Sequence, residues 1–87
     1  MSDKKLQLVI VTPEKAEREA TADMVILPMI DGELGVQPGR AALVGRLGKG
    51  ELRYSMGGTT EKLKIEGGFA QVRSDVVTVL TTKVHKN

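Results

Sequence analysis

The stretch Met24-Val25-Ile26-Leu27-Pro28-Met29-Ile30-Asp31-Gly32-Glu33-Leu34-Gly35-Val36 decides the fold of this 87-residue chain. It begins with nearly continuous apolar sequence, the pattern of a strand that is buried on both faces or lies under a partner. Asp31-Gly32 predicts a tight turn because both residue types tolerate positive φ, and Glu33–Val36 then form a short returning strand. The stretch therefore predicts an antiparallel β-hairpin.

Further strand patterns lie on both sides of this hairpin. Leu6, Leu8 and Ile10 share one face of an early strand. Thr12-Pro13 ends that strand, because proline cannot donate to a β-ladder. The later strand patterns are Leu52–Met56, Lys62–Glu66, Phe69–Arg73 and Val76–Thr81, with turns at Gly57-Gly58, Gly67-Gly68 and Ser74-Asp75. Short strands at such regular spacing are typical of an all-β sandwich or barrel.

Two segments lack the alternating pattern that would assign them to a strand. Lys15–Ala20 favours a helix by local propensity, with Thr12 as its cap and Pro13 at its first position. Such a helix would have only alanine side chains to bury, and packing supplies most helical stability. Residues 15–20 are open to both interpretations, and we expect an exposed edge strand. Gly45 to Gly50 is too rich in glycine for a helix and predicts a loop.

The chain length fits a single domain, expected over residues 1–82, with residues 83–87 as a flexible tail. A chain this short buries only roughly 60% of the surface that its unfolded form exposes, so partners would supplement its stability. No apolar run approaches the ~18 to 20 residues needed to cross a bilayer, and the N-terminus lacks the apolar stretch of a signal peptide. We therefore expect a cytoplasmic protein whose membrane association is indirect.

Residues suited to catalysis, metal binding or cofactor binding are scarce. The sequence has no cysteine, and its only histidine, His85, lies close to the C-terminal end. Asp31 and Glu33 lie across a turn, where carboxylates commonly serve turn chemistry rather than an acid/base pair. Lys49 is followed by Gly50 rather than by Ser or Thr, so the glycine-rich segment lacks the phosphate-binding pattern. The sequence predicts a non-catalytic protein without a cofactor or a metal site.

Charge and aromatic content bear on nucleic-acid binding. The net charge is +2 with both signs interleaved, and Tyr54 and Phe69 are the only aromatic residues. Nucleic-acid binders usually show a basic stripe with stacking aromatics. We keep as an alternative a small β-barrel that binds single-stranded nucleic acid in a salt-sensitive way. Its basic contact residues would be Arg46, Lys49, Arg53 and Lys64.

One string combines several turn and strand features: Gly32-Glu33-Leu34-Gly35-Val36-Gln37-Pro38-Gly39, of the pattern Gly-Glu-x-Gly-x-x-Pro-Gly. It is accompanied by Val11–Lys15, Gly50–Arg53, Gly67–Val72 and Val77–Leu80. In this order and combination the strings resemble one family, the ε subunit of F-type ATP synthases, over its N-terminal domain. The resemblance spans nearly the whole chain. It implies an antiparallel β-sandwich of two packed sheets with about ten short strands.

The resemblance also implies a function. In this family the domain lies at the foot of the rotating central stalk, bound to the γ subunit and touching the polar loops of the membrane-embedded c-ring. We therefore expect a non-catalytic subunit that supports coupling of proton or sodium flow to ATP synthesis. We expect it at the cytoplasmic face of a bacterial inner membrane, and not as a homo-oligomer. Family members commonly carry a C-terminal helical hairpin that restrains ATP hydrolysis, and since no helical periodicity follows Thr82 we expect coupling without that inhibition.

The segment from Asp31 to Leu43 is the expected contact region. Its glycines let another backbone approach closely, and its charged residues offer charge-assisted hydrogen bonds to polar loops. Affinity is expected from an apolar patch against γ, with a place in the core as the alternative for each apolar residue. The expected partner-binding residues are Met29, Asp31, Gly32, Glu33, Arg40, Ala41, Leu43, Val44 and Met56.

Two positions in this region depart from the family pattern. The family usually continues Pro-Gly-His-Ala-Pro-Leu, whereas this chain has Pro38-Gly39-Arg40-Ala41-Ala42-Leu43. Arg40 in place of histidine makes the charge permanent, and Ala42 in place of proline removes a restraint on φ. We therefore expect a less rigid loop with a permanently charged contact.

Overall fold

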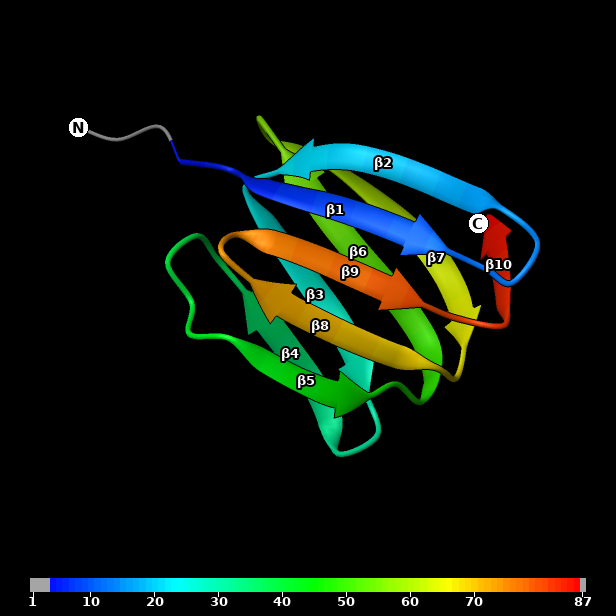
Figure 1. Cartoon of the computed structure of the whole chain (residues 1–87). Coiled ribbons are helices and arrows are strands. Elements are labelled where there is room, and N and C mark those ends of the chain that lie inside the picture. Colours follow the sequence, from blue (N-terminus) through cyan, green and yellow to red (C-terminus); the bar gives the residue numbers. More distant parts are fainter. Residues whose placement is uncertain (1–3, 87) are drawn as a thin grey trace.

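The structure is a computed structural model that describes residues 4–86, and in that range it contains ten β-strands and no helix. The strands are β1 (Leu6–Val11), β2 (Ala16–Ala22), β3 (Met24–Met29), β4 (Gly32–Val36), β5 (Leu43–Arg46), β6 (Lys49–Met56), β7 (Thr59–Glu66), β8 (Phe69–Arg73), β9 (Val76–Leu80) and β10 (Lys83–Lys86). They form two packed sheets of five strands each (Figure 1). The expected β-sandwich of about ten short strands is confirmed.

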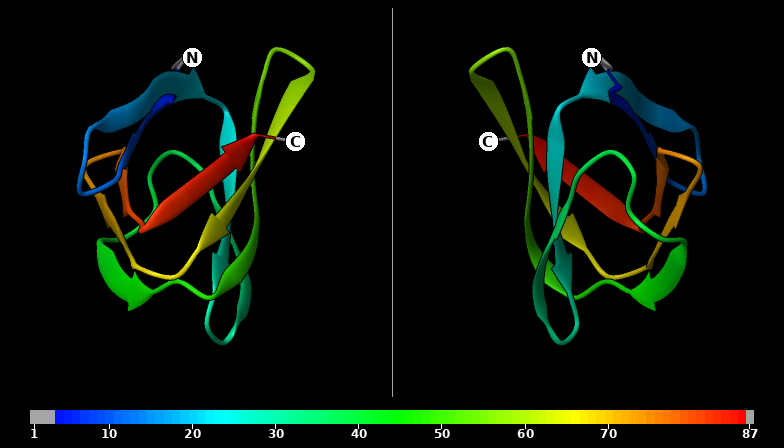
Figure 2. Two further views of the ribbon diagram at one scale, coloured as in Figure 1. Left: turned by 90° about the vertical axis from the view of Figure 1, so that its right-hand side faces the viewer. Right: turned by 90° about the vertical axis from the view of Figure 1, so that its left-hand side faces the viewer.

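The two sheets face each other as separate layers, which the side views in Figure 2 display. Sheet A has the order β2-β1-β9-β8-β5, and sheet B has the order β10-β7-β6-β3-β4. Among the described strand pairs, β1 and β9 run parallel and the others run antiparallel. Both β4 and β5 are therefore edge strands with a backbone side that no neighbouring strand occupies.

Alternation along the strands builds the core between the sheets. Residues at every second position point inward, because successive side chains of a strand lie on opposite faces. Burying each aliphatic side chain contributes about 1.5 to 3 kcal/mol. The largest fully buried side chains are Leu6, Leu8, Ile10, Val25, Leu27, Val36, Leu52, Ile65, Val72, Val77 and Val79.

Strand β3 differs from the strand buried on both faces that its sequence predicts. Val25 and Leu27 are fully buried in the core, whereas Met24 and Ile26, which alternate with them, are only half-buried. No third layer covers the outer side of sheet B within the described residues, so the alternate side chains of β3 lie on an open face. The other interpretation, that a partner covers this strand, stays a prediction.

The hairpin turns follow their local chemistry. Gly57 and Gly58 have φ of 57° and 86°, and Ser74 and Asp75 have φ of 50° and 63°, as two-residue hairpin turns require. These two predicted turns are confirmed. In the β3–β4 hairpin, Met29 pairs with Gly32, so the turn residues are 30 and 31, one position earlier than expected. The positive φ of 127° falls on Gly32 alone in this hairpin.

Residues 15–20 contribute to an edge strand, as expected, rather than to a helix. β2 pairs with β1 along its length, from Leu6 opposite Ala22 to Val11 opposite Ala16, with a bulge next to Ile10. Strand pairing satisfies the backbone of this segment and buries Ala22 completely. A helix here would have buried little apolar surface, so tertiary pairing decides the conformation.

Two further sequence-based expectations are wrong. Gly45 to Gly50 is not a loop: it comprises the end of β5, a bridge from Leu47 to Met29, and the start of β6. Residues 83–86 are not a flexible tail, because β10 pairs with β7 from Lys83 opposite Glu66 onward. Val84 of β10 packs against the core, and burial of this apolar side chain stabilises the strand in sheet B. Residue 87 lies outside the described range.

Candidate functional site

A groove of about 310 Å³ lies between the two edge strands β4 and β5, on one side of the sandwich. Its walls come from the β3–β4 hairpin and from β5, which Figure 1 displays near each other at the lower edge of the view. We call this cavity the β4–β5 groove. Its lining residues are Met29, Asp31, Gly32, Glu33, Leu34, Leu43, Val44 and Gly45.

The groove has an apolar floor. Met29, Leu34 and Leu43 are half-buried and pack against the core. A Cβ at Gly45 would overlap the methyl group of Met29, so the missing side chain lets Met29 of sheet B reach β5 of sheet A. Val44 stands at the rim with 71% of its surface exposed. The groove therefore has an apolar base and an exposed apolar rim.

A fixed carboxylate borders the groove. Arg53 Nη2 donates to both Oε1 and Oε2 of Glu33, each at 3.0 Å, and Nη1 of the same arginine lies 3.8 Å from Glu51 Oε1. The Nε of Arg53 is buried without a hydrogen-bond partner in the described structure. The Glu33 side chain stays 58% exposed, so its carboxylate is oriented by Arg53 and still has acceptor capacity for another donor.

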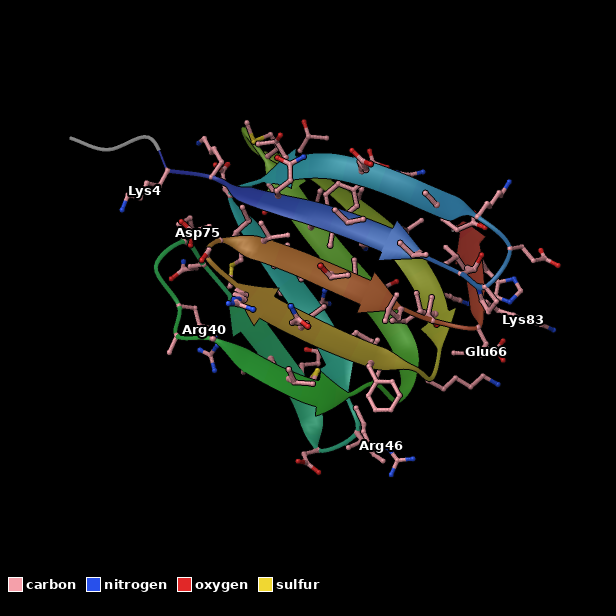
Figure 3. The ribbon with its side chains drawn as sticks, viewed as in Figure 1. Lys4, Arg40, Arg46, Glu66, Asp75 and Lys83 are labelled. Carbon is pink, nitrogen blue, oxygen red and sulfur yellow. The ribbon has the colours of Figure 1, made fainter. Side chains whose placement is uncertain are left out.

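The loop between β4 and β5 lies beside the groove. Its residues border a second hollow of about 310 Å³, lined by Gly35, Gln37, Pro38, Gly39, Arg40 and Ala41. The Gly39 N–H donates to Asp75 Oδ1 at 2.8 Å, and the Arg40 N–H donates to the Gln37 carbonyl at 3.3 Å. Figure 3 displays Arg40 and Asp75 at the same end of the sandwich. Asp75 of the β8–β9 turn therefore anchors the loop that carries Arg40.

The structure brings most of the expected partner-binding residues to one side of the molecule. The β4–β5 groove contains Met29, Asp31, Gly32, Glu33, Leu43 and Val44. Arg40 and Ala41 are exposed in the adjoining loop. Met56 is separate from them, at the end of β6, with 41% of its surface exposed.

Three residues of this site were not found from the sequence. Leu34 lines the groove, Gly45 makes room for Met29, and Arg53 orients Glu33. For Leu34 the signal was available, because its place between Glu33 and Gly35 on a short strand predicts one inward side chain. No local signal marks the pairing of Arg53 with Glu33, because it depends on the strand order β4-β3-β6.

The four basic residues of the nucleic-acid hypothesis do not share one surface. Arg46 pairs with Phe69 in sheet A, whereas Arg53 and Lys64 lie in sheet B, and Arg53 is bound to Glu33. Lys49 lines a separate hollow of about 220 Å³ together with Lys64. These four residues therefore do not form the continuous basic groove that follows the backbone of a single-stranded nucleic acid.

Within residues 4–86, no group of three or more His, Cys, Asp or Glu side chains is arranged to hold a metal ion. The same part of the chain contains no helix long and apolar enough to span a membrane.

The sequence of this chain is similar to those of two ATP synthase epsilon chains. The ATP synthase epsilon chain of Rhodopirellula baltica is 55% identical over 76 residues, which are 87% of this chain and 59% of that relative. The ATP synthase epsilon chain of Carboxydothermus hydrogenoformans is 38% identical over 86 residues, which are 99% of this chain and 63% of that relative. This chain therefore spans about three-fifths of the length of these relatives.

Solved structures share the fold. A chain in the Euglena gracilis mitochondrial ATP synthase, in a structure of its OSCP, F1 and c-ring, superposes with a TM-score of 0.87 at 24% identity. That match covers 98% of this chain and 57% of the other. A chain in the central stalk and c-ring structure of the Tetrahymena thermophila mitochondrial ATP synthase gives a TM-score of 0.77 at 14% identity, covering 99% of this chain and 69% of the other.

A family-level match covers most of the sequence. The model of the family described as ATP synthase, Delta/Epsilon chain, beta-sandwich domain matches residues 5–87. The two five-stranded sheets agree with that description. The chain belongs to the ATP synthase delta/epsilon chain family, of which it carries the β-sandwich domain.

Proposed function

We propose that this chain is a non-catalytic central-stalk subunit of a rotary F-type ATP synthase, and that its β4–β5 side links the γ subunit to the c-ring. Its role is to support coupling of proton or sodium flow to ATP synthesis. The observation that carries the proposal is the gathering of Met29, Leu43 and Val44 with Asp31 and Glu33 in one groove. The relatives named ATP synthase epsilon chain support the assignment to this complex.

The two kinds of residue in this region have different roles in the proposal. The apolar floor and the exposed Val44 supply affinity, because well-packed apolar anchors dominate most interfaces. The exposed side chains of Asp31, Glu33 and Arg40 contact polar loops and set the orientation of the partner. The γ subunit thus takes the apolar groove, and the loops of the c-ring take the charged rim.

The complex determines where this chain acts. In the proposal the chain is peripheral, at the cytoplasmic face of a bacterial inner membrane, and its membrane association is indirect through γ and the c-ring. It works in a hetero-complex rather than as a homo-oligomer, because its groove is filled by a different subunit. The β4–β5 groove, of about 310 Å³, is large enough for one or two apolar side chains of that subunit.

Binding to γ tests the apolar part of the proposal. The purified chain should co-elute with the γ subunit of its own synthase at micromolar concentration. Val44→Asp should weaken this binding at least about tenfold, since it places an unpaired charge against an apolar surface. The matched control is Thr60→Asp, which adds the same charge at an exposed position of β7. Absence of co-elution by the wild-type chain would count against the proposal.

Cross-linking tests the contact with the c-ring. The chain has no cysteine, so a single cysteine introduced at Arg40 provides a unique reactive group. We expect Arg40→Cys to cross-link to a c subunit in the reconstituted synthase, whereas Thr21→Cys on β2 does not. Equal cross-linking from both positions would show that the β4–β5 side has no preferred contact with the ring.

A further inference from the structure

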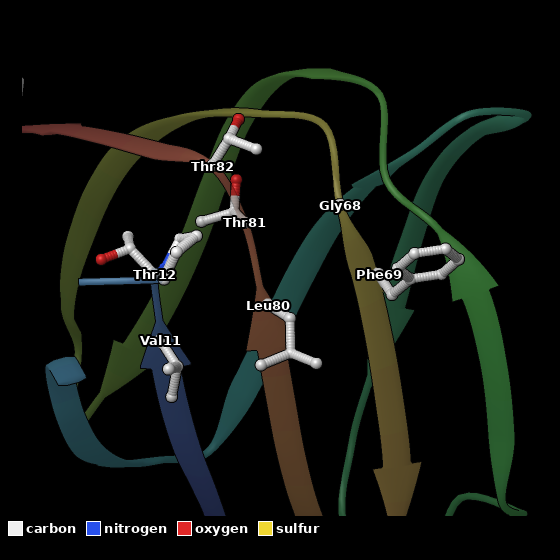
Figure 4. Close-up of a pocket in the computed structure, with 8 residues that line it drawn as sticks. Val11, Thr12, Gly68, Phe69, Leu80, Thr81 and Thr82 are labelled. Atoms are coloured by element: carbon white, nitrogen blue, oxygen red, sulfur yellow. The ribbon is translucent and has the colours of Figure 1, made fainter. Parts of the chain in front are cut away.

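The connection from β9 in sheet A to β10 in sheet B is held by several contacts. The hydroxyl groups of Thr81 and Thr82 donate to the Glu66 carbonyl at 3.2 and 2.7 Å. A Cβ at Gly68 would overlap the carbonyl oxygen of Leu80, so two backbone segments lie in direct contact there. Figure 4 shows this end of the sandwich, where Gly68 and the two threonines border a hollow of about 390 Å³. Backbone contacts thus fix this crossing between the sheets.

The connection from β4 in sheet B to β5 in sheet A is held differently. Its residues, 37–42, are exposed apart from the half-buried Pro38, so apolar packing contributes little to their position. Within residues 4–86, one hydrogen bond ties residues 38–41 of this loop to another segment, from the Gly39 N–H to Asp75 Oδ1 at 2.8 Å. The position of the loop therefore depends on a single side chain.

The turn at the centre of this loop leaves the donor available. The Arg40 N–H donates to the Gln37 carbonyl at 3.3 Å, which closes a four-residue turn, and Gly39 has φ of 89° at its third position. Proline at the second position and glycine with positive φ at the third are typical of a type II turn. Because the internal hydrogen bond uses the Arg40 N–H, the Gly39 N–H donates outside the turn. Its acceptor is a carboxylate, which makes the bond charge-assisted.

Asp75 is itself fixed to sheet A. It has φ of 63° in the turn between β8 and β9, a conformation that aspartate tolerates better than most residues. Its backbone carbonyl accepts from the Gln7 N–H of β1 at 2.9 Å. Three segments therefore meet at this residue: the β8–β9 turn, the start of β1 and the β4–β5 loop. The loop is attached to sheet A from the point where it leaves sheet B, at the end of the sandwich where Figure 3 labels Asp75 and Arg40.

The two charged groups on the β4–β5 side are thus held from different sheets. Glu33 is oriented by Arg53, and both residues lie in sheet B. The loop that carries Arg40 is anchored by Asp75 at the end of sheet A. Because the two charges have opposite sign, a partner that contacts both has to offer donors to Glu33 and acceptor oxygens to Arg40. Such a partner spans both sheets.

We propose that Asp75 is a positioning residue for the contact with the c-ring. Its carboxylate holds the β4–β5 loop so that Arg40 meets acceptor oxygens of a polar loop of the ring while Glu33 meets donors. Asp75 acts through the Gly39 N–H rather than by touching the partner. A loop that is ordered in advance loses less conformational entropy on binding, which strengthens the contact. The inference rests on the proposed function, because it takes the c-ring as the partner.

Amide hydrogen exchange in the isolated chain tests the tether. Asp75→Gly removes the carboxylate and still tolerates positive φ, whereas Asp75→Asn keeps an acceptor oxygen. We expect the Gly39 amide to exchange at least about tenfold faster in Asp75→Gly, and Asp75→Asn to restore most of the protection. Glu14→Ala removes an exposed carboxylate from the β1–β2 connection and is the matched control, which should leave this rate unchanged. An unchanged Gly39 rate in a folded Asp75→Gly variant would overturn the inference.

Cross-linking in the reconstituted synthase tests the functional role. We expect Asp75→Gly to lower the yield of cross-links between Arg40→Cys and a c subunit at least about threefold, and Asp75→Asn to restore most of the yield. Glu33→Cys serves as the reference position, because it lies on the β3–β4 hairpin, which Asp75 does not hold. Its yield should be the same with aspartate, asparagine or glycine at position 75. Circular dichroism and urea unfolding verify that each variant folds.

The outcomes separate the inference from the proposed function. Equal Arg40→Cys yields with and without the Asp75 carboxylate would overturn the inference and leave the proposed function intact. An equal loss at both cysteine positions would also overturn it, because the effect would then not be specific to the loop. Failure of Arg40→Cys to cross-link to the ring with Asp75 in place would instead remove the c-ring contact on which both depend.

Discussion

Arg53 and Glu33 are joined across β3, the strand that separates β6 from β4, with Nη2 of the arginine 3.0 Å from both carboxylate oxygens. The arginine side chain is 31% exposed and the glutamate side chain is 58% exposed, so water screens the attraction. The pair is therefore weak as a source of stability, and its main effect is to fix the direction of a carboxylate at the groove.

The first prediction concerns this pair. A double-mutant cycle with Glu33→Gln and Arg53→Gln should give a coupling energy of about 0.2 to 1 kcal/mol in urea unfolding, as exposed pairs do. Arg53→Gln should weaken partner binding by more free energy than this coupling, because a Glu33 side chain released from Arg53 must be ordered again on binding. Lys64→Gln on the same outer face is the control. A coupling of zero together with unchanged binding would show that Arg53 does not orient Glu33.

The second prediction compares two glycines with positive φ. Gly68 has φ of 108°, and a Cβ there would meet the backbone of Leu80 and Thr81, whereas Gly58 has φ of 86° and open space around it. Gly58→Ala should cost about 1 to 2 kcal/mol from backbone strain alone. Gly68→Ala should cost at least about 3 kcal/mol, because the end of β9 must also move. Urea unfolding of both variants measures the difference, and equal losses would contradict the close approach.

The third prediction concerns a contact between the sheets. Arg18 Nη1 of β2 donates to the hydroxyl oxygen of Tyr54 in β6 at 2.6 Å, and only 7% of Tyr54 is exposed. Arg18 also lies 3.9 Å from Glu61 Oε1, a longer contact near an exposed carboxylate. A cycle of Arg18→Ala and Tyr54→Phe should give a coupling of about 1 kcal/mol, because a charged donor meets a largely buried acceptor.

The matched control for that cycle is Glu61→Gln paired with Arg18→Ala. Its coupling should be smaller than that of the tyrosine pair, since surface ion pairs contribute little. If both cycles gave the same coupling, the hydroxyl of Tyr54 would not be the principal partner of Arg18.

The fourth prediction concerns pH. The side-chain hydrogen bond from Lys5 and the backbone N–H of Gly57 hold the pKa of Asp23 below its usual value of 3.8. A carboxylate with a lowered pKa in the folded state stabilises the fold above its usual pKa, and this contribution is lost as pH falls through the lowered value. Asp23→Asn should therefore reduce stability at neutral pH, and its difference from the wild-type chain should shrink below about pH 4.

Urea unfolding at a series of pH values measures this effect. Asp75→Asn is a useful control, because Asp75 accepts a hydrogen bond from the Gly39 N–H at 2.8 Å but forms no ion pair with a lysine within residues 4–86. A difference between Asp23→Asn and the wild-type chain that stayed constant down to pH 2 would contradict the assignment.

The sequence predicted the features that depend on neighbours along the chain. The turns at Gly57-Gly58 and Ser74-Asp75 follow from residues that adopt positive φ, and the strands around them follow from alternation. The loop that the sequence predicts from Gly45 to Gly50 is wrong for a physical reason. Its glycines are not turn residues: they leave room for Met29 and Pro28, which are distant in sequence, so strand pairing continues through the segment.

In the candidate site, too, some features follow from the local sequence and others from the strand order. Residue type and order alone predict a contact region from Asp31 to Leu43 and place this chain near one family. That Glu33 is bound by Arg53, and that Val44 faces a groove while Met56 lies elsewhere, depends on which strands become neighbours. Strand order brings together residues from separate parts of the chain, and no local pattern encodes it.

By itself, the sequence determined the all-β character, the positions of most turns and the family, because these follow from alternation, backbone freedom and a specific string of residues. Only the tertiary structure decided that β10 extends sheet B, that β1 pairs in parallel with β9, and that Val11, Leu80 and Phe69 form one apolar row. Each of these depends on hydrogen bonds between segments far apart in sequence, which become favourable only once both sheets bury their inner faces against each other.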